Sequence, residues 1–183
     1  AANLMYENNK YTSEENCMGV IYLVRDPRGI VPSHSYHFNI NKQEAFEKVV
    51  NSNQIIFNPK NNICVPLSNW EVHIKSWQKT NIPKIFIRFE DLVSDTINTI
   101  YKCIKFLNSI NIEFNYNSKK IENIYQSTKF KKLKNLEESS GFIIGKDKNF
   151  FRKGDLKNDD ISQKIQNELI DLFEEKMREF DYI

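Results

Sequence analysis

The chain has 183 residues, of which 40% are hydrophobic and 27% are charged, a composition typical of a globular protein with one hydrophobic core. Its formal net charge of +2 argues against a protein built wholly around nucleic acid, yet it allows a local basic pocket for an anion. No apolar run approaches the roughly 20 residues that a membrane-spanning helix needs, so the sequence predicts no membrane partner.

The three cysteines, Cys17, Cys64 and Cys103, lie far apart and form no C-x-x-C pair. This spacing predicts neither a disulfide framework nor a zinc site. It is typical of a protein that stays in a reducing compartment, and we therefore expect a cytoplasmic location.

Strand and helix signals alternate in the first part of the chain. The continuous apolar run from Met18 to Val24 predicts a strand that is covered on both faces. Asp26 and Pro27 suit the start of a helix, but Pro32 would break one of its turns. We therefore expect that helix either to begin near Gly29 or to kink at Pro32. Residues 51–67 are rich in asparagine and contain two prolines, which predicts a long loop.

Further elements are predicted along the rest of the chain. The spacing of Ser68 and Glu71 is that of a capping box and predicts the start of a helix that carries both tryptophans. Lys84–Arg88 is predicted to be a second apolar strand. Helical periodicity then predicts a helix capped by Ser94 or Asp95 and a closing amphipathic helix. Shorter helices are expected at 118–126 and 128–138, and a polar loop at 149–160.

This order of elements predicts an α/β fold, with a parallel sheet flanked by helices. Ligands of such sheets bind outside the carboxyl ends of the strands, where Arg25 and the residues after Arg88 fall. The Arg25 guanidinium, the hydroxyl of Ser33 and the N–H groups of a helix start would together suit a phosphate. The spacing alone favours a simpler interpretation, in which Arg25 pairs with a nearby carboxylate and Ser33 lies on a helix surface.

Four segments favour the phosphate site over the simpler interpretation: VRDPRGIVPS (24–33), RFEDL (88–92), TKFKKL (128–133) and FFRKG (150–154). In this order they resemble motifs of the sulfotransferases that use 3′-phosphoadenosine 5′-phosphosulfate (PAPS), especially the cytosolic and bacterial branch of that family. EVHIKSWQ (71–78) resembles a further family segment. The resemblance covers nearly the whole chain. It implies the P-loop NTPase-like sulfotransferase fold and a single sulfotransferase domain over residues 1–183.

The resemblance also implies which residues hold the nucleotide. The 3′-phosphate would be held by Arg25 and Ser33 together with a late basic loop, which comprises Phe150, Arg152, Lys153 and Gly154. The adenine would lie against Phe89, Thr128 and Phe130, with Phe89 standing where the family has a tyrosine. Aromatic faces suit this role, because base stacking is worth about 1–3 kcal/mol. The implied donor is PAPS, the product is adenosine 3′,5′-bisphosphate (PAP), and no metal is expected.

The implied reaction is transfer of a sulfuryl group from PAPS to a hydroxyl or amine of a small-molecule or glycan acceptor, with no nucleic-acid partner. The family's P-K-S-G-T-T-W loop and its K-T-H segment, which carries the catalytic base, have no counterpart in residues 1–183. We therefore expect no catalytic base in this chain, and expect it to be the C-terminal portion of a domain whose base lies just upstream of Ala1. Two other functions stay open: a non-catalytic PAP-binding domain and a P-loop kinase-like phosphotransferase.

Overall fold

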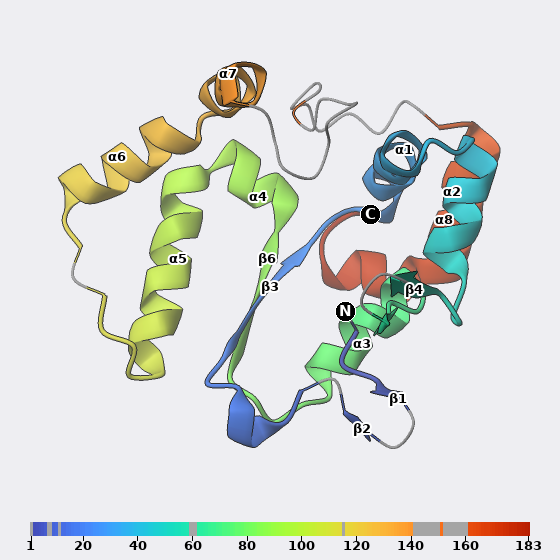
Figure 1. The fold of residues 1–183 in the computed structure, drawn as a ribbon, viewed down its shortest axis with the longest axis horizontal. Helices are drawn as coiled ribbons and strands as arrows, with labels where there is room; N and C mark the ends of the chain where they lie inside the picture. Colours follow the sequence, from blue (N-terminus) through green and yellow to red (C-terminus); the bar gives the residue numbers. More distant parts are fainter. Residues whose placement is uncertain are drawn as a thin grey trace. The chain divides into compact units, whose positions relative to one another are not determined.

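The computed structural model describes residues 2–6, 9–10, 12–58, 62–114, 116–140, 151 and 161–183. The chain divides into two compact units, which are described separately below. Unit 1 comprises Ala1–Phe89 and Lys157–Ile183, and unit 2 comprises Glu90–Leu156 (Figure 1). That both units belong to one sulfotransferase domain stays a prediction.

A parallel pair of strands forms the centre of unit 1. Strand β3 (Val20–Val24) pairs with β6 (Lys84–Arg88), with Val24 opposite Arg88 at the carboxyl ends. The predicted parallel sheet is therefore confirmed. The first strand is not covered on both faces as predicted. Exposure of its side chains alternates, since Val24 is buried whereas Leu23 is 51% exposed. Since paired parallel strands end together, Arg25 and Phe89 both leave the sheet at the same edge.

Helix α1 (Pro27–Phe38) begins directly after β3. The Asp26 side chain caps it by accepting a hydrogen bond from the backbone N–H of Arg28 at 2.8 Å. The helix thus starts at Pro27, not near Gly29, because proline fits the first helical position once a cap precedes it. It includes Pro32 within its span, where one backbone donor is lost. Helix α2 (Lys42–Val50) follows, capped by the side chain of Asn41.

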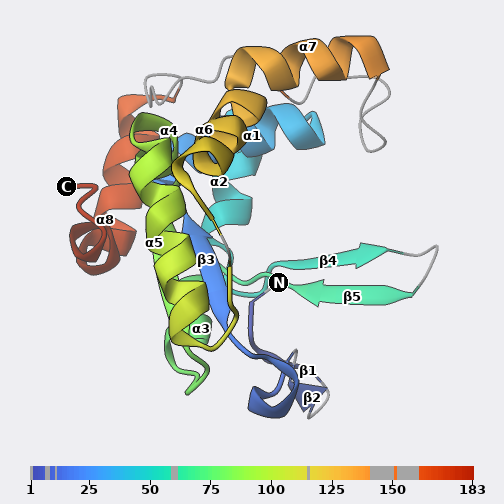
Figure 2. The same cartoon turned by 90° about the vertical axis from the view of Figure 1, so that its left-hand side faces the viewer.

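The predicted loop over residues 51–67 is wrong, because the segment contains two paired strands. Strand β4 (Ile55–Asn58) pairs antiparallel with β5 (Ile63–Pro66), so that the two strands run side by side (Figure 2). The β-branched residues in both runs favour strands, and they outweigh the turn-forming asparagines and prolines. Among the hydrophobic side chains of the hairpin, that of Phe57 is 56% exposed.

Helix α3 (Trp70–Gln78) begins one residue later than the capping box predicts. Its cap is Asn69, whose side chain accepts a hydrogen bond from the N–H of Val72 at 2.8 Å. The predicted cap, Ser68, has a positive φ of 60° and donates its hydroxyl to the carbonyl of Ser52 at 2.7 Å. Ser68 therefore anchors the end of the hairpin and does not cap the helix.

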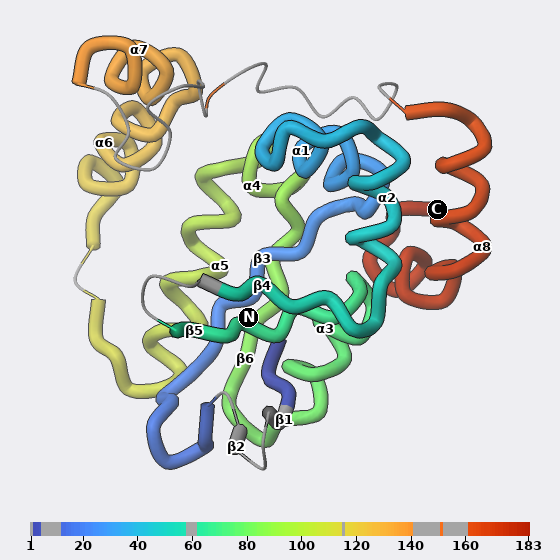
Figure 3. The backbone as a smooth tube through the Cα atoms, turned by 45° about the vertical axis from the view of Figure 1, so that its right-hand side comes forward, coloured from blue at the N-terminus to red at the C-terminus, as the bar shows by residue number. Residues whose placement is uncertain are grey.

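The closing helix, α8 (Gln163–Glu179), follows the predicted periodicity and begins after a Ser162 cap. A non-helical φ/ψ at Phe173 kinks it, and it lies beside α2 (Figure 3). Its apolar stripe supplies much of the core of unit 1. The buried members of that stripe are Ile165, Leu169, Phe173 and Met177.

Two short strands, β1 (Met5–Tyr6) and β2 (Asn9–Lys10), and the 3₁₀ turn η1 (Glu14–Asn16) precede β3.

A partly buried tyrosine–histidine pair joins β3 to α3. The hydroxyl of Tyr22 lies 2.6 Å from Nδ1 of His73. Burial raises the pKa of Tyr22, so its hydroxyl stays protonated and donates to the imidazole. Burial also lowers the pKa of His73 to about 4, so the histidine is neutral at pH 7 and Nδ1 accepts.

This pair makes the stability of unit 1 depend on pH. Between about pH 6.5 and 4 the unfolded chain protonates His73 while the folded chain does not, so stability is lost as the pH falls through this window. We expect His73 alone to remove roughly 2–3 kcal/mol from the free energy of unfolding between pH 7 and pH 4. Urea unfolding of the wild type and of His73→Gln, in which the amide can still accept from Tyr22, checks this. Parallel pH profiles for the two proteins would contradict it.

The described part of unit 2 is helical. Its helices are α4 (Phe89–Ser94, which starts at the last residue of unit 1), α5 (Thr96–Ser109), α6 (Ser118–Thr128) and α7 (Phe130–Ser140). Helix α4 is not predicted from the sequence. Asp95 occupies the cap position of α5 without a side-chain capping hydrogen bond. Within the described residues of the whole chain, no helix is both long and apolar enough to cross a membrane.

Candidate anion-binding site

Arg25 is the residue around which the site is built. It follows the last residue of β3, and its guanidinium carbon lies 4.5 Å from the centre of the Phe89 ring, which follows β6. The parallel pairing of the two strands thus brings together two predicted site residues that are 64 positions apart in the sequence. The ring face attracts the cation, and a planar guanidinium can form paired hydrogen bonds with an anion.

Ser33, the second residue predicted to hold the phosphate, lies half-buried on the second turn of α1. It lies six residues after Pro27, which corresponds to about 9 Å along the helix axis. Arg25 and Ser33 are therefore carried by consecutive elements, one at the strand end and one on the helix that follows. A joint contact of both side chains with a phosphate stays a prediction.

The charge of Asp26, which adjoins Arg25, is balanced within the fold. Asp26 is 3% exposed, and its carboxylate accepts from Nε of Arg28 at 3.0 Å and from a terminal guanidinium nitrogen at 2.6 Å. This bidentate ion pair offsets the negative charge that would otherwise repel an anion at Arg25. The carboxylate next to Arg25 is thus already paired with Arg28 inside the protein.

The predicted helix N–H donors of α1 are already used inside the protein. The N–H of Arg28 donates to the Asp26 side chain, and those of Gly29 and Ile30 donate to the Asp26 carbonyl at 3.0 and 3.2 Å. Pro27 has no N–H group. The expectation that the helix start contributes donors to a phosphate is thus not met, because the cap and the first turn take them.

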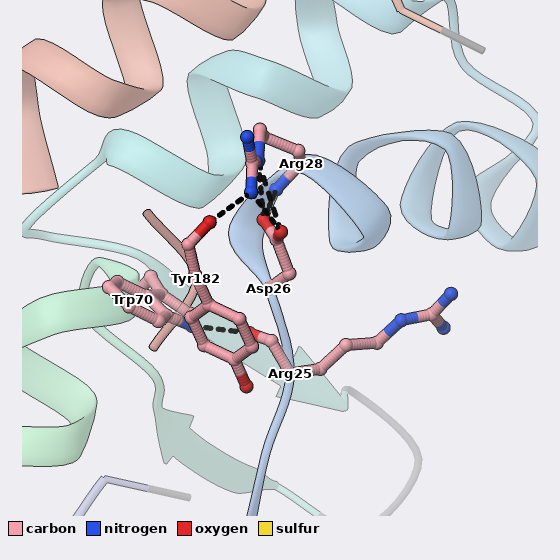
Figure 4. A network of polar contacts seen from close by, with 5 residues as sticks. All are labelled: Arg25, Asp26, Arg28, Trp70 and Tyr182. Atoms are coloured by element: carbon pink, nitrogen blue, oxygen red, sulfur yellow. Dashed lines mark hydrogen bonds and ion pairs between the residues drawn. The ribbon is translucent and has the colours of Figure 1, made fainter. Parts of the chain in front are cut away.

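Sequence reasoning missed the residues that hold the end of β3 in place. The indole Nε1–H of Trp70 donates to the Arg25 carbonyl at 3.0 Å, and Arg28 donates to the Tyr182 carbonyl at 2.7 Å. In Figure 4 these contacts lie on one side of the strand end, while the Arg25 side chain extends away from them. The only sequence signal was the cap preference of Asp26, since the other partners are distant in the chain.

Two of the predicted adenine contacts lie in unit 2. Thr128 is the last residue of α6, and its hydroxyl donates to the Ile124 carbonyl at 2.9 Å. Phe130 begins α7, and its ring centre lies 6.0 Å from that of Phe151 in an edge-to-face arrangement. The N–H of Phe151 also donates to the buried carboxylate of Glu137 at 2.9 Å. Helix α7 therefore anchors Phe151, which lies within the segment predicted to form the basic loop.

Four predicted residues, Phe150, Arg152, Lys153 and Gly154, lie outside the described residues. Their roles stay predictions. In the part of the chain that is described, no group of three or more His, Cys, Asp or Glu side chains is placed to hold a metal ion.

Comparison with known proteins identifies the family. The sulfotransferase domain family matches residues 7–181. The chain belongs to the sulfotransferase family. Among solved structures, the fold of this sulfotransferase chain is similar to that of mouse sulfotransferase SULT7A1 complexed with PAP, with a TM-score of 0.61 at 23% sequence identity. The similarity covers 87% of this chain and 58% of the mouse chain, so the chain spans little more than half of that structure.

This structural similarity shows the fold and confirms the predicted α/β sulfotransferase architecture. None of the curated proteins is close enough in sequence to match the chain. The family assignment agrees with the resemblance that the four sequence segments carry.

Proposed function

We propose that the intact protein is a sulfotransferase that transfers a sulfuryl group from PAPS to a hydroxyl or amine of a small-molecule or glycan acceptor, and releases PAP. Membership of the sulfotransferase family supports this proposal. So does the similarity in fold to a sulfotransferase solved with PAP.

One observation carries the assignment of the donor site to this edge of the sheet. The Arg25 guanidinium lies over the Phe89 ring at the shared carboxyl end of two parallel strands. Ligands of open α/β sheets bind at this edge. A planar guanidinium can form paired hydrogen bonds with a phosphate, and its position over the ring limits the ways in which it can turn.

In the proposed complex, Arg25 and Ser33 bind the 3′-phosphate of PAPS from unit 1. Arg152, Lys153 and Gly154 bind the same group, through side-chain cations and backbone N–H groups. Phe89, Thr128 and Phe130 face the adenine. Phe89 lacks a hydroxyl, so it contributes an apolar surface and no hydrogen bond.

The donor supplies an activated sulfuryl group, whose sulfur–oxygen bond to the 5′-phosphate breaks as the acceptor oxygen or nitrogen bonds to sulfur and gives up its proton to a general base. The residues named above hold the leaving nucleotide, so their contribution is to binding and orientation. The 3′-phosphate lies at the far side of the ribose from the reacting sulfur. Arg25 therefore selects PAPS over nucleotides that lack this phosphate and takes no part in bond breaking.

Calorimetric titration of the intact protein with PAP and with 5′-AMP tests the proposal, because the two nucleotides differ only in the 3′-phosphate. We expect PAP to bind at least 100-fold more tightly, as each charge-assisted hydrogen bond contributes about 1.5–3 kcal/mol. Equal affinities would contradict the assignment of a 3′-phosphate site. Sulfuryl transfer from PAPS in the presence of a chelator would separate this activity from magnesium-dependent phosphoryl transfer.

We also propose that the protein acts in the cytoplasm. The free cysteines Cys17, Cys64 and Cys103 support this, since the three thiols are partly buried and not bonded to one another.

A further inference from the structure

Hydrogen bonds to backbone carbonyls hold the end of β3 in place. Their donors, Trp70 and Arg28, are not among the residues proposed to contact the nucleotide. The carbonyl of Arg25 accepts the indole N–H of Trp70 at 3.0 Å. Trp70 is itself buried, with its ring centre 5.3 Å from that of Phe173 and 6.3 Å from that of Tyr182. The direction of this carbonyl is therefore set by a side chain that the core holds in place.

The segment after α8 completes this support. Asp181 adopts a positive φ of 52°, which turns the chain back, and the N–H of Tyr182 donates to the Met177 carbonyl at 2.9 Å. The Tyr182 ring lies near Trp70 and also near Arg88, whose guanidinium carbon is 5.1 Å from the ring centre. Its carbonyl accepts from Arg28, which also binds Asp26.

These contacts matter for Arg25 because the direction of a side chain depends on the backbone that carries it. Arg25 lies one residue beyond Val24, the last position of β3 that pairs with β6. The Trp70 hydrogen bond fixes the peptide between Arg25 and Asp26, and the Arg28 bridge fixes the residue that follows. In Figure 4 the Arg25 side chain leaves on the opposite side from this support.

We propose that Trp70 and Tyr182 are positioning residues for recognition of the 3′-phosphate, and that they act through the Arg25 backbone without touching the ligand. This inference rests on the proposed function. A guanidinium that is already oriented loses less conformational freedom when the anion binds, and the bound state is favoured by that difference. Loss of the support should therefore weaken the contribution of the 3′-phosphate and spare the rest of the nucleotide.

The test is the ratio of the dissociation constants of 5′-AMP and PAP, measured by calorimetry on the intact protein. Trp70→Phe keeps an aromatic ring in the core but removes the N–H donor. We expect it to reduce this ratio about 3- to 10-fold, in line with the loss of one hydrogen bond, with little change in the affinity for AMP. Tyr182→Leu removes the ring beside Trp70 without a change in charge and should lower the ratio in the same direction.

Phe46→Leu is the matched control. Phe46 is a buried core aromatic on α2 that belongs to neither the Trp70–Arg25 hydrogen bond nor the Arg28–Tyr182 hydrogen bond, so this substitution should reduce the melting temperature while leaving the ratio unchanged. An unchanged ratio in both Trp70→Phe and Tyr182→Leu, or an equal fall in the control, would overturn the positioning role. A wild-type protein that binds AMP and PAP equally would instead refute the proposed function, so the two failures are distinguishable.

Discussion

Replacement of Arg25 by alanine is expected to weaken PAP binding by about 30- to 1000-fold, or ~2–4 kcal/mol. The substitution removes a half-buried cation that is held over Phe89 at the binding edge of the sheet. Charge-assisted hydrogen bonds to a phosphate are stronger than neutral ones, which is why a single side chain can have this effect. The affinity for 5′-AMP should change little, since AMP lacks the 3′-phosphate. Calorimetric titration with both nucleotides measures the two effects.

Two further variants separate the contribution of charge from that of geometry. Arg25→Lys keeps the positive charge but loses the planar fork and its stacking on Phe89, so we expect an intermediate affinity for PAP. Arg178→Ala makes the same change in net charge at an exposed position on α8, where the arginine pairs with Glu174. This control should leave PAP binding as it is in the wild type. If the Arg25→Ala protein bound PAP as tightly as the control, Arg25 would not be part of the binding site.

Replacement of Asp26 by alanine is expected to lower the free energy of unfolding by about 3 kcal/mol or more. Loss of a helix cap alone typically costs about 1 kcal/mol. Removal of one member of a buried ion pair costs more, because the Arg28 guanidinium is left without its carboxylate; the two side chains are 5% and 18% exposed. Urea unfolding at pH 7 measures the change.

Glu174→Ala is the matched control for Asp26. It breaks an ion pair with Arg178 whose side chains are 57% and 64% exposed, and such exposed pairs contribute about 0–1 kcal/mol. Both substitutions remove one carboxylate from a pair with arginine. If Asp26→Ala were no more destabilising than Glu174→Ala, the ion pair at the start of α1 would not be important for stability.

The sequence predicts well the elements whose signals are local. The second strand, Lys84–Arg88, has the predicted bounds, and the apolar repeat of residues 161–180 is a helix from Gln163 to Glu179. The hairpin at Ile55–Pro66 was not predicted, because its asparagines and prolines indicate turns while its β-branched residues determine the structure. The capping-box spacing predicts Ser68 as the cap of the helix, whereas Asn69 forms the cap. The two differ by one residue, which this spacing does not resolve.

In the candidate site, too, local sequence signals identify some residues and not others. Arg25 and Phe89 were each recognisable from the segments that carry them, and their proximity follows from the pairing of two parallel strands. The residues that hold the backbone around Arg25 in place were not recognisable from the sequence. Trp70 reaches the Arg25 carbonyl across 45 residues of sequence, and Arg28 reaches the Tyr182 carbonyl across 154. Contacts of this kind depend on how the helices pack around the strand ends, and no local pattern specifies them.

The central claim is that Arg25 and the basic loop around Arg152 bind one and the same 3′-phosphate. A crystal structure of the intact protein with PAP tests it most directly. We predict that the 3′-phosphate lies within hydrogen-bonding distance of the Arg25 guanidinium, the Ser33 hydroxyl and residues 152–154. A bound PAP whose 3′-phosphate lies away from Arg25, or contacts Arg25 but none of residues 152–154, would contradict it.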